Sequence, residues 1–179
     1  MKYISLGVKS PRGNTTACYA IVDDELYDEL KKYNWSLSNH GYAQRGTYNN
    51  GKVSVIPMHR QIMGLTFGDN KCVDHINGNR LDNRKSNLRI CTRAENSHNM
   101  KISKRNKSGA KGVLHVTIKV KRKSGKLYTK EYWRASITLN RKNIYLGFFP
   151  YNCEGFQEAK TAYNEAAIKY FGKFARLNE

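Results

Sequence analysis

Acidic residues are few in this sequence, and long apolar runs are absent. The 179 residues include 14 Asp and Glu against 32 Lys and Arg, which gives a formal net charge of +18 at pH 7. No apolar run approaches the roughly 20 residues of a membrane-spanning helix, and no signal-peptide core follows Met1. We therefore expect an intracellular protein that neither spans a membrane nor is secreted.

Closely paired cysteines are also absent. Cys18, Cys72, Cys91 and Cys153 lack the short spacing that structural zinc sites use, and thiols stay reduced inside cells. We expect neither zinc nor a disulfide, and we interpret each cysteine as a small core or boundary residue.

Positive charge is concentrated in the second half of the chain. Residues 101–179 hold 18 basic and 5 acidic residues, a net charge of +13, whereas residues 1–100 hold 14 and 9, a net charge of +5. Such an excess indicates a polyanionic partner, with a membrane surface as the weaker candidate. Residues 101–110 are typical of a basic linker between two domains.

Residues 72–99 predict a compact unit of two strands and a helix. Residues 72–76 and 88–91 are short apolar runs, and Asn77-Gly78 is a strong turn signal after the first. Thr92 and Glu95 form a capping-box pattern, which predicts that a helix starts at Thr92. That helix would carry Asn96.

The polar residues of this unit suit the hydrolysis of a phosphodiester. Asp74 and Asn96 offer oxygen ligands to a hard metal ion, and His75 could accept a proton from water near its usual pKa of about 6.5. The side-chain amide of Asn87 could hold the intervening loop. Adjacent strand residues point to opposite faces, so Asp74 and His75 can share a site only if the strand twists or ends at His75.

The ordered set Asp74-His75, Asn87-Leu88-Arg89 and Asn96 resembles the HNH endonucleases of the ββα-metal class, in the branch of phage and intron-encoded homing endonucleases. The resemblance implies that His75 is the general base, Asn87 a structural residue, and Asp74 with Asn96 the ligands of Mg²⁺, for which Mn²⁺ could substitute. Asn96 replaces the histidine of the motif, so we expect a modest metal affinity. The alternative is a polar hairpin whose asparagines only cap loops.

Residues 1–71 are typical of an α+β scaffold. We predict strands at residues 2–8, 17–22, 35–44 and 52–56, a turn cluster at 10–14, a hairpin turn at 49–51, and helices at 25–33 and 58–63 with Pro57 in the first turn of the second. His59-Arg60 also precedes the motif in the HNH branch. His59 could be a buried brace or lie beside the active centre, and Arg60 could contact a phosphate or brace the fold.

Residues 111–179 predict a three-stranded antiparallel sheet packed on one helix. The strands are expected at residues 112–120, 128–139 and 142–149. The helix should end at Gly172, and its apolar stripe would be Phe156, Ala159, Tyr163, Ala166, Ala167 and Tyr170.

The segments Lys111-Gly112-Val113, Trp133 to Ile137, Ile144 to Phe149, Ala159 to Ala167 and Leu177-Asn178 resemble the apetala or ethylene-response-factor (ERF) DNA-binding domain. The resemblance implies a sheet that lies in the major groove, with contacts from His115, Trp133, Thr138, Asn143 and Tyr145, although Trp133 and Tyr145 could equally be packing residues. Leu114, His115, Thr138 and Asn143 replace arginines of that family, so its base preference does not transfer. The expected phosphate contacts are Lys119, Lys121, Arg122, Arg134, Arg141 and Lys142.

Together these patterns predict an α+β chain with an HNH nuclease domain (residues 1–100, core 71–100) and an ERF-like domain (111–179). The predicted function is a site-preferring DNA endonuclease, by resemblance a phage-type homing endonuclease, with double-stranded DNA as partner in the cytoplasm of a bacterial host. No membrane contact or obligate protein partner is expected. The first alternative is a DNA-binding regulator with a degenerate HNH domain, and the second is an RNA-binding or RNA-cleaving protein.

Overall fold

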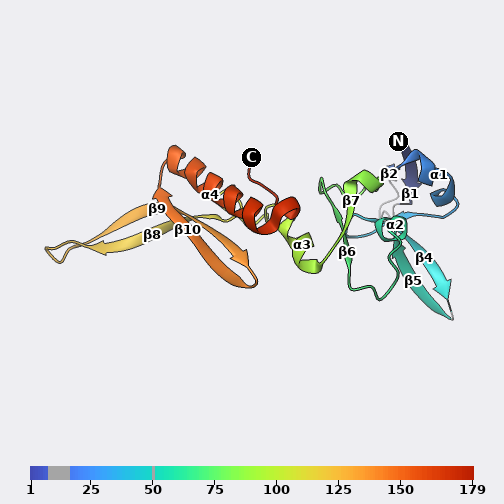
Figure 1. Ribbon diagram of the computed structural model, residues 1–179, viewed down its shortest axis with the longest axis horizontal. Helices are drawn as coiled ribbons and strands as arrows, with labels where there is room; N and C mark the ends of the chain where they lie inside the picture. Colours follow the sequence, from blue (N-terminus) through green and yellow to red (C-terminus); the bar gives the residue numbers. More distant parts are fainter. Residues whose placement is uncertain (8–16, 50) are drawn as a thin grey trace. The chain divides into compact units, whose positions relative to one another are not determined.

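The computed structural model describes residues 1–7, 17–49 and 51–179, which form small antiparallel sheets and four α-helices (Figure 1). The α+β class predicted from the sequence is confirmed. The chain divides into two compact units, Met1–Ser97 and His98–Glu179. The turn cluster at residues 10–14 and position 50 lie outside the described residues. In the described part of the chain, no helix is long and apolar enough to cross a membrane.

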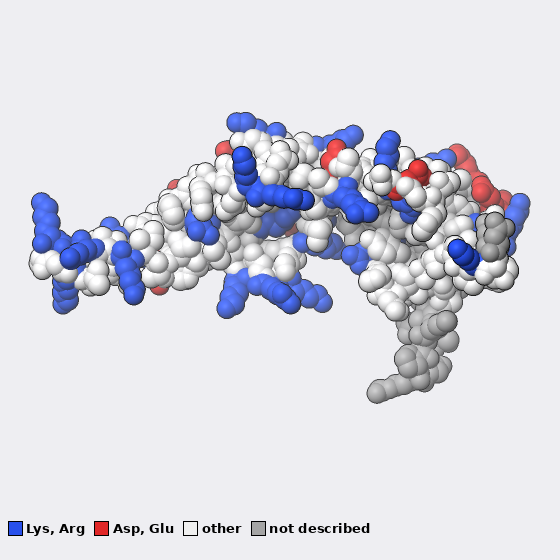
Figure 2. Space-filling model, turned by 90° about the horizontal axis from the view of Figure 1, so that it is seen from below, with Lys and Arg blue, Asp and Glu red and all other residues white. Residues whose placement is uncertain are grey.

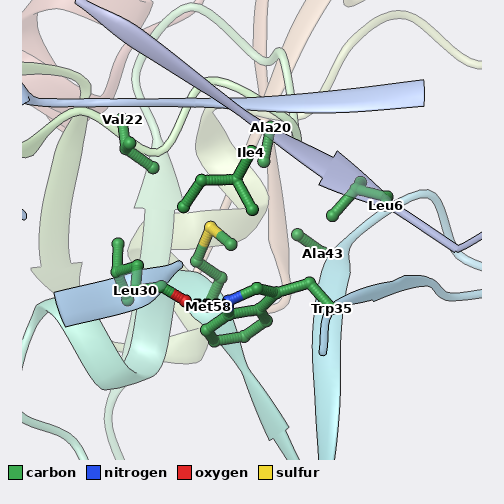
Figure 3. Packing of buried hydrophobic residues seen from close by; sticks show 8 residues of the cluster. All are labelled: Ile4, Leu6, Ala20, Val22, Leu30, Trp35, Ala43 and Met58. Atoms are coloured by element: carbon green, nitrogen blue, oxygen red, sulfur yellow. Dashed lines mark hydrogen bonds between the residues drawn. The ribbon is translucent and has the colours of Figure 1, made fainter. Parts of the chain in front are cut away.

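The first unit begins with a hairpin, a three-stranded sheet and two short helices around one core. These elements are β1 (Lys2–Leu6), β2 (Cys18–Val22), α1 (Asp24–Leu30), β3 (Ser36–Leu37), β4 (Ala43–Asn49), β5 (Lys52–Pro57) and α2 (Met58–Ile62). Figure 3 shows that side chains from β1, β2, α1 and β4, together with Trp35, surround Met58 of α2. The indole N–H of Trp35 donates to the Leu30 carbonyl over 2.8 Å, so the ring packs without an unsatisfied donor.

Three predicted boundaries in this unit are wrong. The strand expected at residues 35–44 is two strands, because the backbone reverses at Gly41, whose φ is +78°, and the Ser38 hydroxyl accepts from the Tyr42 N–H at 3.0 Å. Pro57 ends β5 ahead of α2 instead of lying in the first turn of that helix. Helix α1 ends at Leu30, short of residue 33.

The motif region folds as predicted, into strand, loop, strand and helix. Its elements are β6 (Cys72–His75), the 3-10 turn η1 (Lys85–Asn87), β7 (Leu88–Cys91) and α3 (Arg93–His98). The capping box is formed, since Thr92 Oγ1 accepts from the Glu95 N–H at 3.2 Å and Glu95 Oε2 accepts from the Thr92 N–H at 2.8 Å.

The second unit is a three-stranded antiparallel sheet with one long helix on one face, as predicted. The strands are β8 (Val113–Lys121), β9 (Leu127–Leu139) and β10 (Lys142–Pro150), in the order β10-β9-β8, and the helices are α4 (Cys153–Phe171) and the 3-10 turn η2 (Gly172–Phe174). Helix α4 presents small residues to the sheet, and Ala159 and Ala167 pack against Ala135 and Ile137 of β9.

One residue of the predicted helical stripe is misplaced. Tyr170 is 36% exposed, and Phe171 covers the core instead. Residues four apart lie on the same face of a helix. Tyr163 and Ala167 are buried, so the next residue on that face is Phe171.

The end of the chain closes this unit through Asn178. Its side-chain oxygen accepts from the Lys111 N–H at 2.7 Å and its amide donates to the Lys111 carbonyl at 3.1 Å. Its backbone N–H donates to the side chain of Asn164 on α4 at 2.8 Å. Helix α4 and the segment that leads into β8 are therefore both held by Asn178.

Candidate active site

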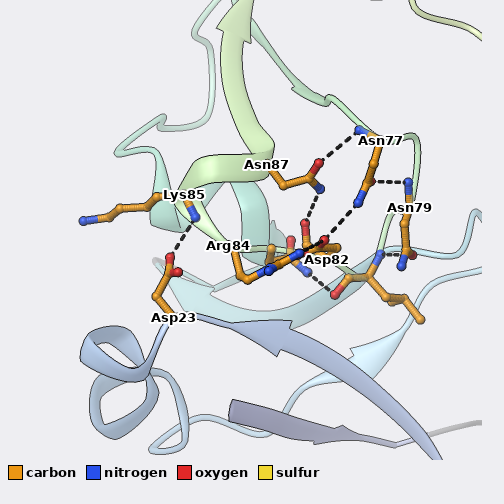
Figure 4. Close-up of polar contacts among 9 residues, drawn as sticks. Asp23, Asn77, Asn79, Asp82, Arg84, Lys85 and Asn87 are labelled. Carbon is orange, nitrogen blue, oxygen red and sulfur yellow. Dashed lines mark hydrogen bonds and ion pairs between the residues drawn. The ribbon is translucent and has the colours of Figure 1, made fainter. Parts of the chain in front are cut away.

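The loop between β6 and β7 is held by side-chain amides (Figure 4). Asn87 is only 7% exposed; its Nδ2 donates to the Asp82 carbonyl at 2.8 Å, and its Oδ1 accepts from the Asn77 N–H at 3.0 Å. Asn79 adds a turn of its own, because its Oδ1 accepts from the Leu81 N–H at 3.1 Å. One buried amide thus joins both sides of the loop.

Asp82 is the second fixed point of this loop. Its buried carboxylate accepts from Arg84 Nε at 2.8 Å, from Arg84 Nη2 at 2.7 Å and from Asn77 Nδ2 at 2.9 Å. These hydrogen bonds, led by those from Arg84, hold the pKa of Asp82 below its usual value. The loop is therefore closed by an ionised carboxylate at neutral pH.

The first hairpin supports the loop from outside. The Ile21 N–H donates to the Leu81 carbonyl and the Asn83 N–H donates to the Ile21 carbonyl, both at 2.8 Å. The Lys85 N–H donates to Asp23 Oδ2 at 2.7 Å. The scaffold that precedes the motif in sequence therefore fixes the motif in space.

His75 is enclosed by two rings, one from α2 and one from the turn before β4. It is 5% exposed, and its ring centroid lies 5.2 Å from that of His59 on α2 and 5.8 Å from that of Tyr42. The guanidinium of Arg80 lies 4.9 Å above the Tyr42 ring. His59 is thus both buried and beside the centre, the two placements that the sequence left open.

This enclosure favours neutral rings. Burial lowers the pKa of His75 below 6.5, although a hydrogen bond with Asn83 and the charge of Asp74 partly oppose the shift. Burial also lowers the pKa of His59 to about 3. A neutral imidazole has one nitrogen that can accept a proton, so His75 is in the form that a base requires at neutral pH.

Asp74 lies directly across the hairpin from Arg89, whose Nε and Nη2 donate to Asp74 Oδ2 at 2.8 and 2.6 Å. Strand β6 ends at His75, which meets the geometric condition for Asp74 and His75 to share a site. Asn96 is half-buried on α3.

The residue types here fit a hard divalent ion. Asp74 and Asn96 offer carboxylate and amide oxygens, and Arg89 fixes the orientation of the carboxylate, as second partners of metal ligands do. Within residues 1–7, 17–49 and 51–179, no three His, Cys, Asp or Glu side chains gather into a metal-binding group. An ion held here would keep water or phosphate as its other ligands.

The sequence is similar to known proteins over most of its length. A family model described as HNH endonuclease matches residues 57–98. A protein of Acanthamoeba polyphaga mimivirus, named as the uncharacterized HNH endonuclease L560, is 31% identical over 171 residues, which cover 93% of this chain and 78% of that protein. The chain belongs to the HNH endonuclease family.

Two further relatives match less of the chain. Protein 3.8 of Escherichia phage T7 is 37% identical over 70 residues, 39% of this chain and 49% of that protein, so the match spans about half of its length. A solved structure entitled "DNA binding and cleavage by the HNH homing endonuclease I-HmuI" aligns with a TM-score of 0.34 and 23% identity over 56% of this chain and 61% of that chain.

Two residues that the sequence suggested as DNA contacts have structural partners in this HNH protein. Arg60 donates from Nη1 to the Lys71 carbonyl at 2.9 Å and from Nη2 to the Thr66 carbonyl at 2.5 Å. These bonds favour the role of Arg60 as a brace of the fold over a contact with phosphate. Trp133 packs beside Phe156 of α4, with ring centroids 4.8 Å apart, and its N–H donates to the Asn152 carbonyl. The geometry therefore favours packing for Trp133.

The remaining predicted contacts lie on the sheet and its turns. Arg134 and Tyr145 are on the face opposite α4, with the guanidinium 5.6 Å from the Tyr145 ring. Arg141 occupies the β9–β10 turn and Lys142 opens β10. Lys119, Lys121 and Arg122 lie toward the free end of the β8–β9 hairpin, where Figure 2 shows Lys and Arg gathered.

Sequence reasoning missed Tyr42, Asp82, Asn83 and the pairing of Arg89 with Asp74. The Arg89 pairing could have been found, because a hairpin that pairs residues 72–75 with 88–91 sets Arg89 opposite Asp74. Tyr42 carried no signal, since only the folded scaffold brings it to His75.

Proposed function

We propose that this HNH endonuclease cleaves double-stranded DNA by hydrolysing phosphodiester bonds, with His75 as the general base. The observation that supports this most is the enclosed, neutral imidazole of His75 beside Asp74, at the end of a strand whose following loop is fixed by Asn87. By resemblance, the biological role is homing of a mobile gene.

In this mechanism His75 accepts the proton of a water that attacks the phosphorus in line with the departing 3′ oxygen. Asn87 keeps the loop after His75 in place, and Arg89 keeps the Asp74 carboxylate in one orientation. Asp74 and Asn96 would hold Mg²⁺, or Mn²⁺ as a substitute, and such an ion stabilises negative charge on phosphoryl oxygens. The pH dependence of the reaction would come from His75, whose burial among the surrounding rings favours the neutral imidazole.

The second unit is proposed to recruit duplex DNA in the manner of the ERF domain. Its support is the net charge of +13 over residues 101–179 and the position of Arg134 and Tyr145 on a sheet face that α4 leaves uncovered. Lys119, Lys121, Arg122, Arg141 and Lys142 are proposed phosphate contacts, which position DNA without specifying its sequence.

A plasmid cleavage assay tests the proposal. Supercoiled DNA bearing candidate sites is incubated with Mg²⁺ and either the wild type, His75→Ala, or His40→Ala, which alters an exposed histidine of the same unit. We expect the wild type and His40→Ala to convert supercoils to nicked or linear DNA, and His75→Ala to lose at least 100-fold in rate, in line with the roughly 10²–10⁴ that a general base contributes.

Two results would contradict this. Equal cleavage by His75→Ala would remove that residue as the base. DNA binding without cleavage by the wild type, on DNA that includes its selected site, would favour the regulator with a degenerate HNH domain.

A further inference from the structure

The sheet of the second unit has one face that no helix of that unit, residues 98–179, covers. Val113, Ala135 and Ile137 are buried on the α4 side, so the residues that alternate with them point the other way. We call this opposite side the outer face. The register aligns three residues across it, because Arg134 of β9 lies between Leu114 of β8 and Phe148 of β10.

The outer face is unusually apolar for an exposed surface. Leu114 is 48% exposed, Ile118 39%, Tyr145 64% and Phe148 55%. Phe148 also meets Tyr132 edge to face, with ring centroids 6.1 Å apart. Large apolar side chains that gather on one face, with polar residues around them, mark an interaction site.

Arg134 is the cation at the centre of this face. Its guanidinium lies 5.6 Å from the Tyr145 ring, and its buried Nε has no hydrogen-bond partner within the described residues. Lys130, opposite Ile118, adds a second positive charge. Glu131 points to the other face, where it lies 3.6 Å from His115, so no acidic side chain of β9 faces outward.

This combination of apolar and positively charged side chains on the outer face fits duplex DNA. A cationic face in a unit of net charge +13 is complementary to a polyanion, and a sheet or β-ribbon fits the width of the DNA major groove. There, apolar side chains have one partner among the base edges, which is the C5-methyl group of thymine. Arginine prefers O6 and N7 of guanine, and this face has one arginine among four large apolar residues.

We propose that the outer face recognises thymine methyl groups through Leu114, Ile118 and Phe148. These thymines would surround one base pair that Arg134 contacts. This inference rests on the proposed binding of duplex DNA by the second unit and names the sequence class that it prefers. Specificity would then come from burial of methyl groups more than from bidentate hydrogen bonds. The preferred site would contain thymines at several positions.

The experiment uses the full chain in EDTA, so that DNA is bound but not cut. Preferred sites are first selected from a random duplex pool, and the selected duplex is then prepared with thymine or with uracil, which pairs identically but lacks the C5-methyl group. We expect selected sites rich in thymine, and affinity for the uracil duplex lower by about fourfold for each methyl group that is buried.

Substitutions on the outer face test whether that face causes the preference for thymine over uracil. Leu114→Ala and Phe148→Ala should bind the thymine duplex more weakly and discriminate less between thymine and uracil, while their affinity for the uracil duplex stays close to that of the wild type. Ile168→Ala is the matched control, because it removes a 56% exposed apolar side chain from α4 in the same unit; it should keep the full preference.

The outcomes separate this inference from the proposed function. If wild type binds thymine and uracil duplexes equally, the inference is overturned while DNA binding stands. If no duplex is retained from the pool, the proposed DNA contact fails and the inference with it. If Leu114→Ala instead dissociates a dimer of the chain and leaves base choice unchanged, the face is occupied by a second copy and the inference is overturned.

Discussion

His75 is buried beside the rings of Tyr42 and His59, and this burial sets the pH range in which it can accept a proton. Tyr42 and His59 come from segments 33 and 16 residues earlier in the chain. No signal in the sequence pointed to Tyr42, and for His59 the sequence left a place beside the active centre as one of two alternatives. The local motif was predictable because its contacts are short-range: Asn87 bonds to positions ten and five residues away. The enclosure was not, because it depends on how the scaffold packs.

The pH dependence of cleavage should reflect that enclosure. The charged imidazole is disfavoured by burial, so the pKa of His75 lies below 6.5 in the folded protein, and the neutral base persists at lower pH than its usual pKa would allow. We expect the single-turnover rate to be nearly unchanged from pH 8 to 6.5 and to fall only in more acidic solution. A half-maximal rate at pH 6.5 or above would contradict this expectation.

Loss of the Asn87 amide should destabilise the first unit. Asn87→Ala leaves the Asn77 N–H and the Asp82 carbonyl without partners in a buried loop, at a cost of about 1–3 kcal/mol for each group left unsatisfied. Urea unfolding followed by Trp35 fluorescence, in a Trp133→Phe background, measures the free energy of unfolding. Asn70→Ala, at an exposed position, is the control and should change it by less than about 0.5 kcal/mol.

At the scale of elements, most strands and helices followed from local chemistry. The Thr92–Glu95 capping box and the alternation of the three C-terminal strands are local signals, and the predicted elements formed. Two of the differences from the prediction have different reasons. Residues 35–44 were predicted as one strand because the pattern of apolar residues does not show that Gly41 adopts a positive φ. The stripe on α4 was predicted to end at Tyr170, whereas the four-residue spacing from Tyr163 and Ala167 reaches Phe171.

The end of the β8–β9 hairpin is an element whose charge can be tested alone. Its turn is closed by hydrogen bonds from Arg122 N–H to Lys126 and from Gly125 N–H to Arg122, both at 2.9 Å, and it carries exposed cations. Replacing Lys121, Arg122, Lys123 and Lys126 by Gln should reduce the slope of log affinity against log salt by about 0.9 for each phosphate group that the variant no longer binds.

Fluorescence anisotropy over a salt series measures this slope. Lys160→Gln with Lys169→Gln, on α4, is the control for charge removed elsewhere in the same unit. An equal decrease in slope for each charge removed in the two variants would mean that the hairpin end binds no phosphates of its own.

At the scale of the whole molecule, the chain is two compact units with separate cores. We expect two unfolding transitions that respond to different substitutions. Gly112→Ala should lower the midpoint temperature of the second-unit transition only. Gly112 has a φ of +70°, and an added Cβ would lie 2.1 Å from the Tyr163 ring. Leu30→Ala should lower only the first-unit transition, by about 2–5 kcal/mol in unfolding free energy.

Fluorescence of Trp35 and Trp133 in single-tryptophan backgrounds reports the two units separately during thermal unfolding. A shift of both transitions by either substitution would show that the units unfold together.

The irregularity in β10 has a consequence for how this surface can evolve. The register shifts between Tyr145 and Gly147, and this one extra residue lets Tyr145 and Phe148, three positions apart, point the same way. If the same residues paired without the shift, every side chain beyond it would turn over, which would bury Phe148 and Pro150 and expose Phe149. A substitution that let β10 pair without the shift would therefore exchange half of the outer face in a single step, while the first unit of the chain kept its sequence.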